Sequence, residues 1–303
     1  MKTHEPPLAP EVEAAKGLRT GWTTGTCASA AAKAAAVWLA TGTPPAQVEV
    51  PLPGGSRVSF PVADVDPAVP HRCAVVKDAG DDPDVTNGAH VTAGVAWHDG
   101  SGVELRGGPG VGVITLPGLG LPVGAPAINP VPARMIRRSV REVTDRPVAV
   151  TVSVPGGEEM AARTSNARLG IVGGISILGT TGVVRPFSTA AWRASVVQQV
   201  DVAAAQGQCH VVLSTGGRTD AAAQRLLPDL PAVSFVEVGD FTGIALRRAV
   251  ATGVVDRVTF VGMAGKITKL AAGVLMTHYR RSKVDGRLLE EVAVACGAPA
   301  GVV

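Results

Sequence analysis

The chain has few aromatic residues, and this scarcity excludes several classes of partner. Phe, Trp and Tyr together make up 3% of the 303 residues, and there is a single Tyr. Proteins that bind single-stranded nucleic acid rely largely on bases stacking on aromatic rings, and duplex binders need a strongly basic surface. Charged residues make up 17% of this chain, with a net charge of only +3. We therefore expect no nucleic-acid partner.

Cysteines and long apolar runs are also scarce. The four cysteines lie far apart and form no C-x-x-C pair, which predicts neither a zinc site nor a disulfide framework and hence no protein-bound metal. Residues 1–17 are polar and proline-bearing, unlike a signal peptide. Proline and glycine interrupt the longest uncharged stretch, residues 107–133, so it is no membrane helix. We expect a cytoplasmic protein without a membrane partner.

Glycine and proline are abundant, with 37 and 23 residues. The most informative glycine-rich segment is residues 168–186, RLGIVGGISILGTTGVVRP. Glycine lets backbone N–H groups approach a ligand closely, so we interpret 169–172 as a strand, 173–182 as a ligand loop and the residues after Ser188 as a helix. The segment matches no dinucleotide or P-loop fingerprint. It therefore predicts a cofactor site of unspecified type, with a tight structural turn as the alternative.

The two halves of the chain differ in pattern, which predicts two domains. The first half combines helical patterns at 23–40 and 130–144 with strand patterns that include a hairpin at 48–62. After Ser165, apolar runs alternate with helical patterns; these runs are at 169–172, 210–213, 233–238 and 258–261. We predict an α+β domain with mainly antiparallel strands over residues 1–165, followed by an α/β domain with a mostly parallel, Rossmann-like sheet over 166–303.

Six segments, in order along the chain, resemble the CbiD family, the cobalt-precorrin-5B C1-methyltransferases of anaerobic cobalamin biosynthesis. The resemblance covers about residues 17–290. The segments are GWTTGTCA (21–28), KDAGDDPDVT (77–86), GLGLPVG (118–124), AINPVP (127–132), the glycine-rich segment 168–186, and GK followed by KLAAG within 265–273.

This resemblance implies methyl transfer from S-adenosylmethionine to C1 of a cobalt-bearing tetrapyrrole, giving cobalt-precorrin-6A. The sulfonium methyl is already a strong electrophile, so the enzyme mainly aligns donor and acceptor, and positioning alone supplies about 7–11 kcal/mol. Cobalt enters only as part of the substrate. By this reading, residues 1–165 face the tetrapyrrole and residues 166–303 bind S-adenosylmethionine.

The resemblance and the loop pattern together predict which residues bind the cofactor. Asp240, after a predicted parallel strand, is expected to accept the ribose hydroxyls of the donor, and glycines let its amino-acid end approach the backbone. The predicted cofactor-binding residues are Gly173, Gly174, Gly179, Thr180, Thr181, Gly216, Gly217, Asp240 and Gly262.

The acetates and propionates of a tetrapyrrole call for cations and for helix N-terminal N–H groups. The predicted substrate-binding residues are Thr24, Thr26, Lys77, Arg185 and Lys266. Asp78, in an acidic loop, is the predicted catalytic residue, as a proton acceptor or as a counter-charge to the sulfonium. Solvated surface charges, helix caps and turn-forming aspartates are the alternatives.

Two other functions stay open at this stage. One is an α/β enzyme that depends on a nucleotide cofactor, NAD or ATP, which the missing fingerprints disfavour. The other is a non-catalytic small-molecule-binding module whose glycine loops only shape turns. The sequence also leaves a homo-oligomer open.

Overall fold

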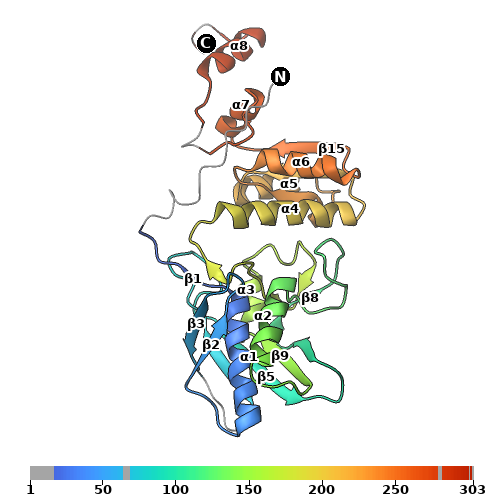
Figure 1. Cartoon of the computed structure of the whole chain (residues 1–303). Helices are drawn as coiled ribbons and strands as arrows, with labels where there is room; N and C mark the ends of the chain where they lie inside the picture. Colours follow the sequence, from blue (N-terminus) through green and yellow to red (C-terminus); the bar gives the residue numbers. More distant parts are fainter. Residues whose placement is uncertain (1–16, 64–68, 279–281, 300, 302–303) are drawn as a thin grey trace. The chain divides into compact units, whose positions relative to one another are not determined.

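The computed structural model describes residues 17–63, 69–278, 282–299 and 301. The chain forms two compact units that divide between Ser188 and Thr189 (Figure 1). We call these the N-terminal unit and the C-terminal unit. The sequence pattern placed the division after Ser165, whereas the structure groups residues 166–188 with the N-terminal unit. Among the described residues, no helix is both long and apolar enough to span a membrane.

In its described residues, the N-terminal unit combines three helices with short, mostly antiparallel strands. Its elements are β1 (Gly21–Trp22), α1 (Thr24–Thr41), β2 (Gln47–Pro51), β3 (Arg57–Pro61), β4 (Arg72–Val76), β5 (His90–Trp97), β6 (Val103–Gly107), β7 (Gly110–Val111), β8 (Val113–Ile114), α2 (Pro130–Arg141), β9 (Val148–Ser153), α3 (Gly157–Ala161), β10 (Ile171–Val172), β11 (Gly174–Ile175) and β12 (Val183–Val184).

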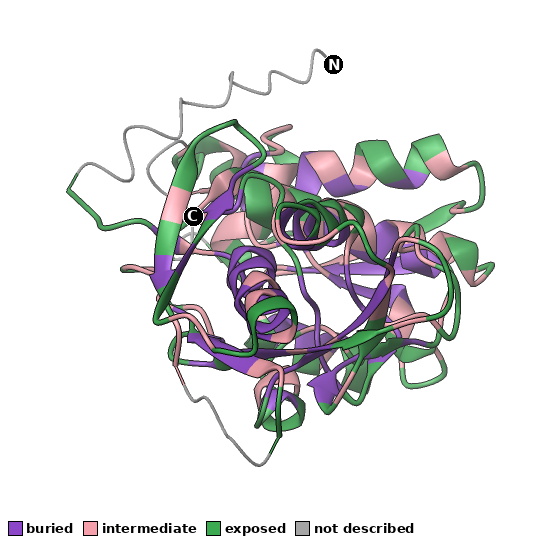
Figure 2. Ribbon diagram, turned by 60° about the horizontal axis from the view of Figure 1, so that its bottom comes forward, coloured by how far each residue is buried: buried purple, intermediate pink, exposed green. Residues whose placement is uncertain are grey.

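Helix α1 forms the centre of this unit because its side chains are small. Alanine dominates the helix, and most of its residues are buried (Figure 2, purple). A helix that is apolar all round must be enclosed on several sides. Helix α2 packs against it on one side and strands β4 and β5 on another. The hydroxyl of Thr23 caps the first turn, and Gly42 ends the helix in the left-handed conformation with φ +80°.

The largest sheet of the unit has the strand order β4-β5-β9-β6. Strands β4, β5 and β9 are antiparallel neighbours, and β6 joins β9 in parallel. Strands β2 and β3 form the predicted hairpin, in the register Val50↔Val58. The valines of β5 and β9 that point toward α1 form the core with its alanines.

The glycine-rich segment does not begin the parallel sheet, so this part of the prediction was wrong. Strand β10 pairs antiparallel with β8, β11 pairs parallel with β7, and β12 pairs antiparallel with β1. All three partner strands belong to the N-terminal unit. Two-residue strands carry too little pattern of their own to reveal their partners, which tertiary contacts decide.

The C-terminal unit contains a small parallel sheet, as the alternating pattern predicted. Three strands in the order β14-β13-β15 are all parallel. The elements are α4 (Thr189–Ala205), β13 (His210–Ser214), α5 (Gly217–Leu226), the 3₁₀ turn η2 (Ala232–Ser234), β14 (Phe235–Glu237), α6 (Thr242–Thr252), β15 (Arg257–Val261), α7 (Ala264–Ala271) and α8 (Gly286–Ala295). Its main core cluster is formed by residues of α4, α6, the central strand β13 and its neighbour β14. The fold is therefore mixed, with mainly antiparallel sheets first and parallel strands second.

Candidate functional site

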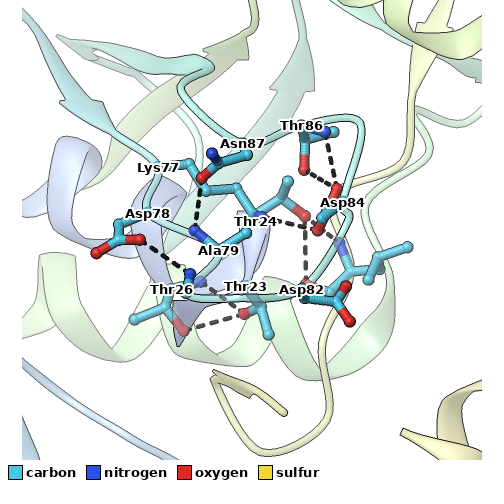
Figure 3. A network of polar contacts seen from close by, with 12 residues as sticks. Thr23, Thr24, Thr26, Lys77, Asp78, Ala79, Asp82, Asp84, Thr86 and Asn87 are labelled. Carbon is cyan, nitrogen blue, oxygen red and sulfur yellow. Dashed lines mark hydrogen bonds and ion pairs between the residues drawn. The ribbon is translucent and has the colours of Figure 1, made fainter. Parts of the chain in front are cut away.

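Three segments that resemble the family meet at the start of α1. They are residues 21–26, the acidic loop 77–87 and the glycine-rich residues 178–184, and Figure 3 shows the polar contacts of the first two. Strand β1 lies between the other two segments, because Trp22 N–H donates to the Asp78 carbonyl at 2.7 Å while Gly21 and Trp22 pair with Val184 and Val183. We call this arrangement the clamp.

The hydroxyls of Thr24 and Thr26 hold the glycine-rich segment against α1. Thr24 Oγ1 accepts a hydrogen bond from the Leu178 N–H at 2.9 Å, and Thr26 Oγ1 donates to the Gly182 carbonyl at 2.7 Å. Of the first helical N–H groups, that of Gly25 donates to Leu178 O and that of Thr26 donates to Thr23 Oγ1. In this state both threonines position the loop. Their role in substrate binding stays a prediction.

Lys77 is enclosed in the clamp and is only 1% exposed. Its Nζ donates to Asp84 Oδ2 at 2.8 Å, while Asp84 Oδ1 accepts from the hydroxyl and the N–H of Thr86 (Figure 3). Burial raises the pKa of Asp84, but the hydrogen bonds from Lys77 and Thr86 outweigh it, so the pKa lies below its ordinary value. Asp84 thus stays ionised at neutral pH, and its bond to Lys77 ties the acidic loop to the end of β4.

Asp78, the predicted catalytic residue, is half-exposed and forms an ion pair with Arg19. Its other oxygen accepts from the Gly80 N–H at 2.9 Å. The Arg19 hydrogen bond is the main reason that the pKa of Asp78 lies below its ordinary value. A carboxylate with a lowered pKa accepts a proton poorly and remains negatively charged at neutral pH. This geometry therefore suits the counter-charge role better than proton acceptance.

Two glycines allow the clamp segments to approach each other. A Cβ on Gly21 would collide with the backbone of Ala79, and a Cβ on Gly80 would collide with the Arg19 carbonyl. Gly80 also has φ +68°, a conformation that favours glycine. These are backbone-to-backbone contacts that no larger residue can make at this distance. Both glycines lie inside the family-like motifs, but no local pattern in the sequence reveals this close approach.

The other predicted residues of the glycine-rich segment lie in the same unit. Gly174 packs on Gly110 in the β11–β7 pair, Gly179 lies against Thr23, and Thr180 and Thr181 are exposed. Gly173 faces open space.

Arg185 follows β12 and is exposed, and its side chain has no hydrogen bond or ion pair to any other described residue. It is therefore available to bind an anion. Next to it, Phe187 is exposed with φ +56°, and its N–H donates to Asp82 Oδ1 at 2.9 Å. A non-glycine residue in this conformation is strained, and the contact with the acidic loop stabilises it.

A second cluster lies within the C-terminal unit, after β14. Asp240 Oδ1 accepts a hydrogen bond from the Thr277 hydroxyl at 3.0 Å and lies 3.1 Å from Lys266 Nζ. Lys266 Nζ also donates to the Gly239 carbonyl, and the buried Lys269 donates to the Thr277 carbonyl at 3.0 Å. Within the described part of the chain, Asp240 Oδ2 has no partner. The cluster thus has one free carboxylate oxygen beside two cations.

Gly216, Gly217 and Gly262 follow strands of the same parallel sheet. Gly216 precedes α5, which no side chain caps, and a Cβ on Gly216 or Gly217 would meet nothing within 4 Å. Gly262 follows β15. These glycines and Asp240 therefore share the carboxyl edge of the sheet, where α/β proteins bind ligands. The predicted cofactor residues divide between the units, since Gly173 to Thr181 belong to the clamp side.

Sequence reasoning missed several residues that complete these clusters. Arg19 pairs with Asp78, Asp84 pairs with Lys77 and accepts hydrogen bonds from Thr86, and Thr277 donates to Asp240. The D-x-T spacing of Asp84 and Thr86 is a recognisable turn signal, because an aspartate often bonds the backbone two residues later. Nothing in the local sequence pointed to Thr277.

Comparison with known proteins gives a family for this arrangement. The model of the CbiD family matches residues 11–186. Two relatives named cobalt-precorrin-5B C(1)-methyltransferase are similar along nearly the whole chain. The protein from Salinispora tropica is 64% identical over 287 residues, 93% of this chain and 75% of its own, and that from Rubrobacter xylanophilus is 63% identical over 310 residues, 97% and 78%. The chain belongs to the CbiD family.

A solved structure of this family is also similar. It is a crystal structure of a cobalamin biosynthesis protein (CbiD) from Archaeoglobus fulgidus, 29% identical, covering 93% of this chain and 85% of its own, with a TM-score of 0.47. The family match of residues 11–186 contains every residue of the clamp and ends two residues before the N-terminal unit does. The similarity to the two methyltransferases extends through the C-terminal unit as well.

Proposed function

We propose that this protein is a cobalt-precorrin-5B C(1)-methyltransferase of cobalamin biosynthesis, with S-adenosylmethionine as the methyl donor. The observation that carries the proposal is the 64% identity to a protein of that name over 93% of the chain. Identity at this level extends through both units, so it includes the clamp and the Asp240 cluster together.

We assign the donor to the carboxyl edge of the parallel sheet in the C-terminal unit. The uncapped start of α5 offers N–H groups and an open approach at Gly216 and Gly217, which suits the carboxylate of the donor's amino-acid end. The free Oδ2 of Asp240 suits the ribose hydroxyls. A further unpartnered group is the buried hydroxyl of Thr242, two residues after Asp240. When bound, S-adenosylmethionine supplies an electrophilic methyl group.

We assign the tetrapyrrole to the N-terminal unit. Arg185 is exposed and free to bind a carboxylate, while Lys77 acts by holding the acidic loop in place. Asp78 stays anionic because of Arg19 and balances positive charge during transfer. The thiol of Cys27 is fully buried, and burial raises its pKa to about 12, so it does not serve as a nucleophile. The chemistry needs alignment and exclusion of water more than a covalent step.

The direct test is an anaerobic assay with purified protein, S-adenosylmethionine and cobalt-precorrin-5B. The expected result is a tetrapyrrole heavier by one methyl group, with the new methyl at C1 by NMR. Equilibrium binding of labelled S-adenosylmethionine, NADH and ATP runs in parallel. Binding of NADH or ATP without S-adenosylmethionine would contradict the proposal, as would no methylation of fresh substrate by folded protein.

The donor site has its own test in Asp240→Asn. Removing the carboxylate charge weakens a charge-assisted hydrogen bond, so we expect Kd for S-adenosylmethionine to rise about tenfold. Asp256→Asn is the matched control, since Asp256 is exposed and precedes the opposite end of β15. Equal Kd values for the two variants would remove Asp240 from the donor site.

A further inference from the structure

One face of the main sheet in the N-terminal unit is lined by small and polar side chains. Alternate residues of a strand point to opposite faces, and Cys73, Val75, Val91 and Ala93 join the core beneath α1. The register then places the remaining residues of these strands on the far face. These are Arg72 opposite Gly94, Ala74 opposite Thr92, and Thr92 opposite Ser153. Such side chains leave room above the sheet.

A cavity of about 440 Å³ lies on this face. Strands β4 and β5 form its floor with Arg72, Ala74 and Thr92, while Pro155 and Met160 of the α3 region form an apolar wall. Its volume falls within the range of small-molecule sites, and the described residues that line it include no carboxylate. The guanidinium of Arg72 is half-buried and has no hydrogen bond or ion pair to any described residue. The cavity therefore has a positive charge that none of the described residues lining it neutralises.

The cavity adjoins the clamp. Gly88 and Ala89 line it, and both are hydrogen-bonded to the backbone of Lys77, with Gly88 N–H to Lys77 O at 2.8 Å and Lys77 N–H to Ala89 O at 2.9 Å. The acidic loop of the clamp thus begins and ends at strands that line the cavity. A ligand in the cavity would lie beside the loop that the buried pair of Lys77 and Asp84 holds.

We infer that this cavity binds one carboxylate side chain of the tetrapyrrole together with its pyrrole ring, with Arg72 as the anion partner. An acetate or propionate matches an unpaired guanidinium, which forms bidentate hydrogen bonds with carboxylates. The ring edge matches the wall of Pro155 and Met160. This inference rests on the proposed function, because it takes cobalt-precorrin-5B as the ligand.

The test compares Arg72→Gln with Arg138→Gln, an exposed arginine of α2. Loss of a charge-assisted contact should raise KM for cobalt-precorrin-5B about tenfold or more, while KM for S-adenosylmethionine stays unchanged. Arg72→Lys should recover part of the loss, because lysine keeps the charge but not the bidentate geometry. Arg138→Gln should match the unchanged protein. As a second approach, Thr92→Phe fills the cavity while residue 72 remains arginine, and it should also raise KM for cobalt-precorrin-5B.

The outcomes separate this inference from the proposed function. Suppose that the unchanged protein methylates the tetrapyrrole, and that Arg72→Gln and folded Thr92→Phe have the same KM for cobalt-precorrin-5B as the unchanged protein. The cavity is then not a substrate site. If no methylation occurs, the proposed function fails. Absorbance titration of cobalt-precorrin-5B into the same variants then still tests whether the cavity binds a tetrapyrrole. Weaker binding by Arg72→Gln than by Arg138→Gln would support the cavity as a tetrapyrrole site, and equal binding would overturn it.

Discussion

Replacing Lys77 with Met should destabilise the N-terminal unit by leaving a carboxylate uncompensated. The Lys77 side chain is 1% exposed and that of Asp84 is 25% exposed, with 2.8 Å between Nζ and Oδ2. Removing one partner of a buried ion pair costs roughly 3–5 kcal/mol. Because Asp84 keeps some solvent contact, we expect about 3 kcal/mol, near the lower end of that range. For a unit of this size that corresponds to a fall in Tm of roughly 6–12 °C.

The assay is urea and thermal unfolding followed by tryptophan fluorescence. Trp22, Trp38 and Trp97 report on the N-terminal unit, and Trp192 lies in the C-terminal unit. Asp84→Asn in the Lys77→Met background should recover part of the lost stability, since it removes the stranded charge.

The matched control is Arg106→Gln. Its partner Glu104 is exposed, as is Arg106 itself, so breaking this ion pair should leave the unfolding midpoint nearly unchanged. Two results would contradict this expectation: a loss for Lys77→Met as small as that for Arg106→Gln, or a further loss when Asp84→Asn is added to Lys77→Met. Either result would mean that Lys77 contributes through its aliphatic stem alone.

Two other substitutions probe the same unit. Hydrogen bonds from Arg57, and secondarily from Lys33, lower the pKa of Glu142 to about 2. The stability that ionised Glu142 gives to the folded protein is therefore fully present above its unfolded-state pKa of about 4.3 and is lost as pH falls toward 2. When the free energy of unfolding is measured between about pH 4.3 and about pH 2, Glu142→Gln should therefore lose less of it than the unchanged protein. Equal losses for the two proteins would contradict this. Gly21→Ala should cost about 3 kcal/mol, because its Cβ would overlap the backbone of the acidic loop, whereas Gly54→Ala faces open space and should be neutral in the same melt.

Local patterns predicted the larger elements well. The predicted helix at 23–40 corresponds to α1, Thr24–Thr41, because a hydroxyl cap and a terminal glycine mark its ends. The apolar runs at 210–213, 233–238 and 258–261 correspond to β13, β14 and β15. The helix is recognisable from its alanine-rich composition and its end signals, and the strands from apolar runs that separate helical patterns.

The candidate site was only partly predictable from the sequence. Motif resemblance identified Thr24 and Thr26, but no local pattern shows that their hydroxyls bond Leu178 and Gly182, which lie 154 and 156 residues further along the chain. Both hydroxyl groups and acidic turns have ordinary local roles, so their long-range contacts appear only in three dimensions.

The antiparallel pairing of Gly21 and Trp22 with Val184 and Val183 has a consequence for synthesis on the ribosome. Strand β1 pairs with β12, the last strand of the N-terminal unit, so this pairing cannot form until more than 180 residues have been translated. Closing so long a loop delays the step that completes the fold, and contacts of high sequence separation slow folding in general. A nascent chain arrested near residue 165 would hold α1 and all four strands of the main sheet yet lack β12, and should be sensitive to proteases where a chain ending at Ser188 resists them.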